Sequence, residues 1–360
     1  MKSNQVRAGV ISLALAVSML GTAGPANAIP DNSTEMTTPS SVLAEVPAHD
    51  IVDADPASSV DVKEEVSELT HKVQLETPAL EQSTSLTIDN GSSFDGSKDG
   101  FAVFHDDEDD STTMVRASND GGQVIFAANS KTGLQDFKLE FDKNIEDTTD
   151  LGNGEVGVRF VDGTSIAVQE PWARDGQGRT LATTLEFSDN AIIQNVEVPK
   201  NASYPVVADP AWKYAYSYNL YKKNPYKVRA LMKKPGKFSA IFPVSGAPKN
   251  FPTKNQKLPL KVAGMNFACT FQKEFWSDGR SGRNWGYQFA AAKGHVDGIG
   301  STIKFSIVET AILSGNPGEN RLWVDAYIKN DKPGGVPRSV YKNGAYTNWS
   351  GFAAKIRAFA

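Results

Sequence analysis

Cysteine is nearly absent from this chain, and its absence excludes two kinds of structural support. Cys269 is the only cysteine among 360 residues, so the chain can form neither an internal disulfide nor a multi-cysteine metal cluster. Histidine is also scarce, since His49 and His71 fall in the N-terminal region and leave only His105 and His295. A two-histidine metal site would have to join these last two, and we do not expect one. The folded parts must be held together by packing alone.

Long hydrophobic runs are also missing. The only candidate, residues 8–20, is too short for a membrane span. It follows Lys2 and Arg7 and precedes Ala26-Asn27-Ala28, which has the small-residue pattern of a cleavage site. The sequence therefore predicts a signal peptide over residues 1–28, a secreted mature chain beginning at Ile29, and no transmembrane segment after signal removal.

Aromatic residues are absent between residues 29 and 92, where 13 acidic residues stand against 2 basic ones. Such a segment has little apolar surface to offset the entropy lost on ordering. We predict an acidic, disordered spacer over residues 29–92. Within it, Val62, Val66, Leu69 and Val73 recur at helical spacing, which allows a transient helix.

Helical periodicity is missing from residues 93–209, which instead show short β patterns separated by turn residues. In Phe137–Phe141, apolar and charged residues alternate with a period of two. Asp162-Gly163 and Ser188–Asn190 predict hairpin turns. The sequence predicts a small acidic, antiparallel β domain over residues 93–209.

The remaining residues, 210–360, predict a second antiparallel β domain, sandwich-like, with one or two short helices. Strong alternating patterns cover residues 212–220, 267–275, 285–291, 303–307 and 322–328. Asn224-Pro225 is typical of a helix start, and residues 352–359 carry apolar residues at helical spacing. The expected fold class is thus mainly β, with two small antiparallel β domains after a disordered tail.

Basic residues are scarce before the junction Tyr204–Trp212, and acidic residues are scarce after it. From Ile29 to Trp212 the chain has 11 basic and 35 acidic residues, net −24, whereas from Lys213 onward it has 24 and 7, net +17. Pro205 and Pro210 restrict their own backbone and that of the preceding residue. We predict a stiff, extended connection between an acidic and a basic domain.

Seven basic residues gather around the predicted short helix. They favour an anionic polymer or anionic membrane surface as partner, because the net charge of +17 in this part of the chain exceeds what solubility requires. Because the chain is expected to be exported, envelope material is favoured over nucleic acid. A merely soluble basic surface is the alternative. These residues are Lys222, Lys223, Lys227, Arg229, Lys233, Lys234 and Lys237.

Two other groups are candidate sites. The glycine-rich stretch Gly294–Gly300 contains His295 and Asp297, a pair that could act as base and orienter, although the glycines are equally what a tight turn demands. Cys269 could form a dyad with His295, but it is in phase with Phe267 and Phe271, so we favour a buried core thiol.

A possible calcium loop involves Asp95, Asp99 and Asp106, whose spacing loosely matches a calcium-binding loop. Its flanks read as strands rather than helices, so a solvated turn is the favoured interpretation. No cofactor other than calcium is suggested.

The stretches Glu170–Gly178 and Tyr204–Pro210 resemble a group of secreted actinobacterial proteins in which a β-rich N-terminal region ends at a YPVVADP-type junction. Some members carry bacteriocin-type C-terminal peptides, which implies that the shared region is a pro-region. Residues 242–248 and 294–298 are similar to an uncharacterised secreted C-terminal domain. The resemblance covers roughly residues 95–360 and implies no catalytic residue.

Together these patterns favour a secreted, non-enzymatic protein, free or associated with the cell envelope. Its basic domain would bind anionic envelope or membrane surfaces, as an antimicrobial or toxin-like effector masked by the acidic region. Two alternatives stay open: an extracellular cell-wall hydrolase that uses His295 and Asp297, and a structural envelope protein.

Overall fold

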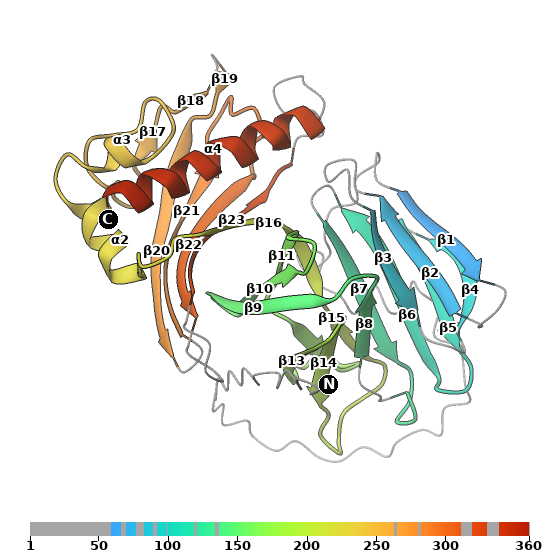
Figure 1. Cartoon of the computed structure of the whole chain (residues 1–360). Coiled ribbons are helices and arrows are strands. Elements are labelled where there is room, and N and C mark those ends of the chain that lie inside the picture. Colours follow the sequence, from blue (N-terminus) through green and yellow to red (C-terminus); the bar gives the residue numbers. More distant parts are fainter. Residues whose placement is uncertain are drawn as a thin grey trace, which may run out of the picture.

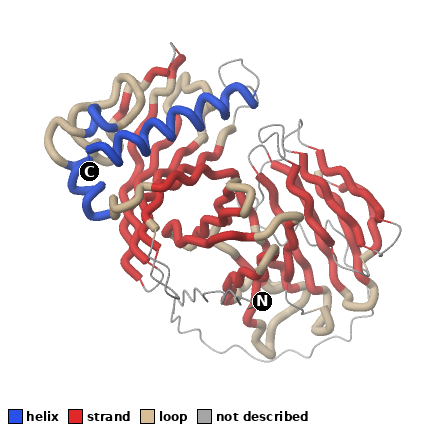
Figure 2. Tube along the Cα trace, in the orientation of Figure 1, coloured by secondary structure: helices blue, strands red, loops and turns tan. Residues whose placement is uncertain are grey.

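Antiparallel sheets run through both halves of the computed structural model, and the helices of its described residues lie in the C-terminal half (Figures 1 and 2). The structure describes residues 59–65, 70–76, 83–88, 92–98, 100–118, 121–133, 137–262, 265–279, 282–310, 319–329 and 338–359. The mainly β, antiparallel fold predicted from the sequence is confirmed. The predicted signal peptide lies outside the described residues. Among those described, no helix combines the length and the apolar character needed to cross a membrane.

The N-terminal half, residues 59–209, contains fifteen strands. They are β1 (Ser59–Glu65), β2 (Thr70–Glu76), β3 (Ser83–Ile88), β4 (Ser93–Lys98), β5 (Phe101–Asp106), β6 (Ser111–Ser118), β7 (Gly121–Ala128), β8 (Phe137–Phe141), β9 (Ile145–Gly152), β10 (Glu155–Phe160), β11 (Ser165–Val168), β12 (Trp172–Arg174), β13 (Ala182–Ser188), β14 (Ala191–Glu197) and β15 (Val206–Asp209).

The C-terminal half, residues 210–359, adds strands β16 (Ala211–Asn219), β17 (Lys257–Leu258), β18 (Lys261–Val262), β19 (Met265–Asn266), β20 (Cys269–Gly279), β21 (Gly282–Ala291), β22 (Thr302–Thr310) and β23 (Asn320–Tyr327). Its helices are α2 (Pro225–Lys233), α3 (Phe238–Ile241) and α4 (Arg338–Phe359).

Two packed sheets make the N-terminal half a sandwich. One is six-stranded, in the order β1-β2-β3-β8-β14-β13, and it packs against β4–β7 and their neighbours around a shared core. In β8, Phe137, Leu139 and Phe141 point into this core while Lys138 is exposed, as the period of two predicts. The predicted turn at Asp162-Gly163 joins β10 to β11, and the second predicted turn joins β13 to β14.

The predicted spacer over residues 29–92 is wrong for three segments, because β1, β2 and β3 pair within the six-stranded sheet. Val73 and Leu75 on β2, and Leu86 and Ile88 on β3, are buried in the sandwich core. Their spacing is two, so the correct pattern is that of a strand. The transient helix predicted over residues 62–75 is likewise corrected to strand at 62–65 and 70–75, which are the parts of it that the structure describes. The rest of the predicted spacer before Ser59 lies outside the described residues.

One strand, β16, belongs to both halves. Its first residues pair with β7 and β11, and Ala215–Asn219 pair with β23. A single fifteen-stranded sheet therefore continues through the junction, in the order β17-β20-β21-β22-β23-β16-β7-β6-β5-β4, with β9–β12 and β15 attached near its middle. The predicted extended conformation of Tyr204–Trp212 is confirmed for β15 and β16. However, Val206–Trp212 are buried inside the sheet, so the predicted boundary at residues 209 and 210 does not separate two independent sheets.

Helices cover one face of the C-terminal sheet. Figure 1 shows α4 crossing β21–β23, with α2 and α3 beside it. The side chain of Asn224 caps α2 by accepting the backbone N–H of Lys227 at 3.0 Å, with Pro225 in the first turn, as predicted. α4 is much longer than the predicted helix over residues 352–359. Phe352 and Ile356 of α4 are buried in the aromatic core of this half.

The hairpin β9–β10 contacts the sheet formed by β20–β23 and joins the two halves. Trp323 packs on Gly157, where even a Cβ atom would come within 2.8 Å of the indole. Beside it, Lys213 lies 2.7 Å from Asp325 and 3.1 Å from Glu155, and Lys304 forms ion pairs with both carboxylates. We call Glu155, Lys213, Lys304 and Asp325 the four-charge cluster. It pairs opposite charges of the acidic and the basic half at their shared strand.

Candidate functional site

The loop between β21 and β22 is a chain of tight turns. The backbone N–H of His295 donates to the carbonyl of Ala292, and that of Gly298 donates to the carbonyl of His295. Gly294, Gly298 and Gly300 have φ values of +82°, +87° and +99°, which side chains disfavour. The glycines of this stretch therefore build the turn that positions His295 and Asp297.

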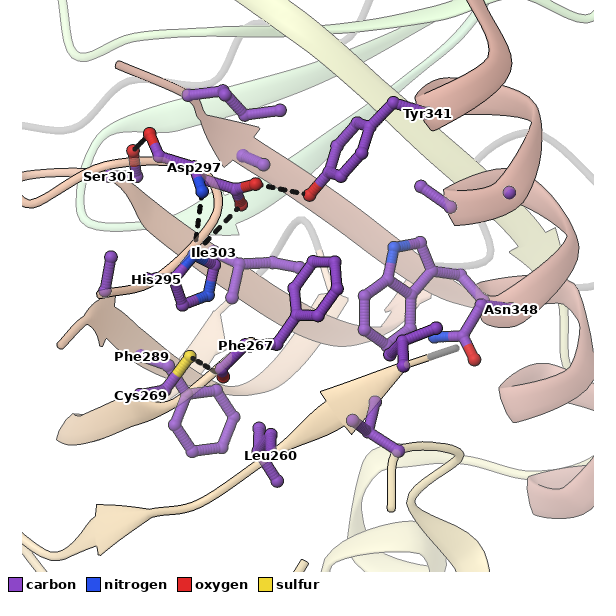
Figure 3. Close-up of a pocket in the computed structure, with 18 of the residues that line it drawn as sticks. Leu260, Phe267, Cys269, Phe289, His295, Asp297, Ser301, Ile303, Tyr341 and Asn348 are labelled. Atoms are coloured by element: carbon purple, nitrogen blue, oxygen red, sulfur yellow. Dashed lines mark hydrogen bonds and ion pairs between the residues drawn. The ribbon is translucent and has the colours of Figure 1, made fainter. Parts of the chain in front are cut away.

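His295 and Asp297 are adjacent, but they do not form a base and its orienter. His295 Nδ1 accepts the backbone N–H of Asp297 at 3.0 Å, and the carboxylate Oδ2 lies 3.7 Å away (Figure 3). Burial lowers the pKa of His295 to about 4, so the ring is neutral at pH 7. Because Nδ1 accepts a hydrogen bond, the ring proton of the neutral imidazole lies on Nε2, where it can donate, and the lone pair on Nδ1 is already engaged.

Asp297 is held by the C-terminal helix. The hydroxyl of Tyr341 on α4 donates to its Oδ1 at 2.6 Å. Burial raises the pKa of Asp297 to about 6, although the hydrogen bond from Tyr341 opposes this shift. The hydroxyl of Ser301 donates to the backbone carbonyl of Asp297 at 2.6 Å and accepts the backbone N–H of Lys329. The carboxylate is therefore fixed in place and buried, and it is ionised above pH 6.

Cys269 lies on the neighbouring strand β20 as a buried thiol, as predicted. It is 5 % exposed and its Sγ donates to the carbonyl of Phe267 at 3.2 Å. Burial, with a smaller effect of the Asp297 charge, raises the pKa of the Cys269 thiol to about 12. A reactive thiolate at neutral pH is therefore disfavoured.

These groups line a cavity of about 260 Å³ between α4 and the sheet. Its walls are mainly aromatic and aliphatic, with the polar groups of the His295 loop among them (Figure 3). On α4, Tyr341, Ala345 and Trp349 recur every four residues and so face the same side. Beside them Gly344 leaves open space, because a Cβ placed there would meet no atom within 4 Å. A cavity with apolar walls and a few convergent polar groups is the usual form of a small-molecule site.

The predicted basic residues lie on and beside α2, at the far end of the sheet from the N-terminal half (Figure 1). Arg229 and Lys233 both pair with Glu274, at 2.8 and 2.6 Å. Glu274 also accepts the indole N–H of Trp285 at 2.8 Å. We call the other five residues the basic surface: Lys222, Lys223, Lys227, Lys234 and Lys237.

The basic surface belongs to a longer stretch without any acidic residue. Residues 210–273 contain 13 lysines and arginines and no aspartate or glutamate. In the structure the first acidic side chain after this stretch, Glu274, faces α2 from β20. Of the 24 basic residues from Lys213 onward, 13 thus lie in this stretch, which contains α2, α3, β17 and β18.

Of the candidate calcium residues, the structure describes Asp95 and Asp106. Asp106 Oδ1 accepts the backbone N–H groups of Glu108 and Asp109, which makes it the cap of the β5–β6 turn. Asp95 lies exposed on β4, and Asp99 is outside the described residues. Within the described part of the chain, no three His, Cys, Asp or Glu residues are grouped to hold a metal.

Sequence reasoning missed Tyr341 and Glu274, which fix Asp297 and the α2 cations respectively. Nothing local to either residue indicates these roles, because each partner is more than 40 positions away.

Comparison of the chain with protein-family models, curated proteins and solved structures found no match. The resemblance to secreted actinobacterial proteins stays a prediction.

Proposed function

We propose that the chain is a secreted, non-enzymatic protein that binds an anionic cell-envelope or membrane surface through the basic surface on α2. The observation that carries this proposal is that residues 210–273 contain 13 lysines and arginines and no acidic residue. Lys213 pairs at the junction of the two halves, whereas the basic surface lies at the far end of the sheet. A cationic patch of this kind attracts anionic lipid or polymer, each lysine or arginine near the surface contributing about 1 kcal/mol.

The pairing of α2 supports an accessible basic surface. Among the described residues, the acid that forms ion pairs with the α2 cations Arg229 and Lys233 is Glu274, which belongs to the same half of the chain. The N-terminal half instead contributes Glu155 to Lys213 and Lys304 at the junction. Masking of the basic surface by the acidic region, and release of a toxin-like effector, stay predictions.

The test compares two variants of the full mature chain with equal changes in net charge. Lys222→Gln, Lys227→Gln and Lys234→Gln remove charge from the basic surface. Lys98→Gln, Lys131→Gln and Lys200→Gln remove the same charge from exposed sites of the N-terminal half.

Binding is measured by co-sedimentation with phosphatidylglycerol vesicles and, separately, with teichoic acid, to tell a membrane from a wall polymer. Three lysines at about 1 kcal/mol each predict roughly 100-fold weaker binding for the first variant, and little change for the second. Salt should weaken the binding of the native chain, since the Debye length is about 8 Å at physiological ionic strength. Equal binding by both variants would refute the proposed surface.

A further inference from the structure

The cavity under α4 has the walls of a site for an apolar molecule. Phe242, Leu260, Phe289, Phe305 and Trp349 line it, and four of these belong to the aromatic and aliphatic core of the C-terminal half. Apolar cavities in proteins exclude water and accept apolar molecules of matching size. No side chain of the described residues fills this cavity of about 260 Å³.

One end of the cavity offers a defined pair of hydrogen-bonding groups. Asp297 uses Oδ1 for the hydroxyl of Tyr341, while its Oδ2 receives no hydrogen bond from the described residues. His295 uses Nδ1 for the backbone of Asp297, which leaves Nε2–H as a donor. These side chains are only 14 % and 6 % exposed. Asp297 Oδ2 is not among the fully buried side-chain atoms without a partner, so a ligand in the cavity can reach it and donate a hydrogen bond to a charged acceptor.

We propose that this cavity binds a small apolar molecule that ends in one hydrogen-bond donor, an aliphatic alcohol or amine, with the donor at Asp297 Oδ2. Since a cavity of about 150 Å³ accepts benzene, one of 260 Å³ holds roughly ten non-hydrogen atoms. A chain of nine carbons with a terminal oxygen or nitrogen fits that size. A fatty acid of the same length does not suit the site, because its carboxylate would face that of Asp297.

The test titrates the full mature chain at pH 8 with 1-nonanol, nonylamine and nonanoic acid by isothermal calorimetry. We expect the alcohol and the amine to bind with one-to-one stoichiometry, and the acid at least tenfold more weakly. Stronger binding of the amine than the alcohol would identify a charged head group as the natural class, and the reverse a neutral one. Binding of neither, or equal binding of the acid, would overturn the proposal.

Two glycines of α4 provide a matched pair of variants. A Cβ at Gly344 or at Gly351 meets no atom within 4 Å, and leucine is a better helix former than glycine, so both variants should fold. Only Gly344 lines the cavity. Gly344→Leu should weaken binding of the alcohol at least tenfold, and Gly351→Leu should leave it within twofold.

If Gly344→Leu binds as tightly as the native chain, the ligand is not in this cavity and the proposal is wrong. Vesicle binding by Gly344→Leu should equal that of the native chain, because the basic surface on α2 is separate. Failure of the cavity proposal is thereby distinguished from failure of the proposed surface binding.

Discussion

Substitution of Asp325 tests the four-charge cluster that joins the two halves of the molecule. Asp325 is 1 % exposed and lies 2.7 Å from Lys213 and 3.7 Å from Lys304. Burial alone would raise the pKa of Asp325, but the two lysines outweigh it and hold the pKa below its usual range. In Asp325→Ala, both lysines must share Glu155, and one positive charge is left without a partner in a buried place.

The expected cost follows from what remains in the cluster. Removal of one member of a buried ion pair costs about 3–5 kcal/mol, because the other charge stays buried and uncompensated. Since Glu155 can still pair with either lysine, we expect the lower end, about 3 kcal/mol of unfolding free energy. A partly exposed pair on the same sheet, with side chains 44 % and 29 % exposed, serves as control. Glu309→Ala, which breaks the contact with Arg283, should cost less than about 1 kcal/mol.

The measurement is urea unfolding at pH 7, followed by tryptophan fluorescence. Because β16 belongs to both halves, we expect one transition whose midpoint falls for Asp325→Ala. The contribution of Asp325 to the free energy of unfolding is fully present above the unfolded carboxyl pKa of about 4. It is lost as the pH falls through the pKa of Asp325 in the folded state, which is lower. The difference between native and variant should therefore shrink only below pH 4. A loss under 1 kcal/mol, equal to that of Glu309→Ala, would refute the role given to the cluster.

Three further predictions concern the remaining sites. Glu274→Gln should tighten binding to phosphatidylglycerol vesicles, measured by co-sedimentation, because Arg229 and Lys233 lose their neutralising partner; weaker or unchanged binding would contradict this. Asp297→Asn should lose the pH dependence that the raised pKa of Asp297 gives. In urea unfolding, the free energy of unfolding of the native chain should rise by about 2 kcal/mol relative to this variant as the pH falls from 7.5 to 4. A carboxyl whose folded pKa is raised stabilises the fold below its unfolded pKa, and this contribution is lost as the pH rises through the folded value of about 6. Limited proteolysis of the native chain should spare residues 204–212, because β15 and the start of β16 are buried; rapid cleavage there would show that the junction opens.

The sequence predicted best those elements whose pattern is complete within a few residues. β8 alternates over five residues, Asp162-Gly163 fits a two-residue turn, and Asn224 precedes a proline at a helix start. In each case the backbone preference and the burial pattern agree. The turn that carries His295 was predicted for the same reason, since its glycines are needed for positive φ.

Elements that depend on a distant partner could not be predicted in this way. Among its described side chains β2 gives Val73 and Leu75 to the core, and it is held by pairing with β1 and β3 and by packing against the facing sheet. The first half of α4 contains Gly344 and other weak helix formers, and it is held from outside, by Tyr341 on Asp297 and by core residues further along. The cavity forms where α4 lies over the sheet, so no local sequence pattern predicts it.

The most direct test of the central claim, that α2 meets an anionic surface, uses a fluorescent label on single cysteines. The native Cys269 is buried with a pKa of about 12 and should not react with a thiol reagent. Ala230→Cys places a label on the exposed side of α2, and Ala182→Cys places the same label on an exposed position of the N-terminal half.

On addition of phosphatidylglycerol vesicles, the emission of an environment-sensitive label at residue 230 should shift to the blue, and that at residue 182 should not change. A shift at residue 182 with none at residue 230 would contradict the claim that the basic surface on α2 is the binding face.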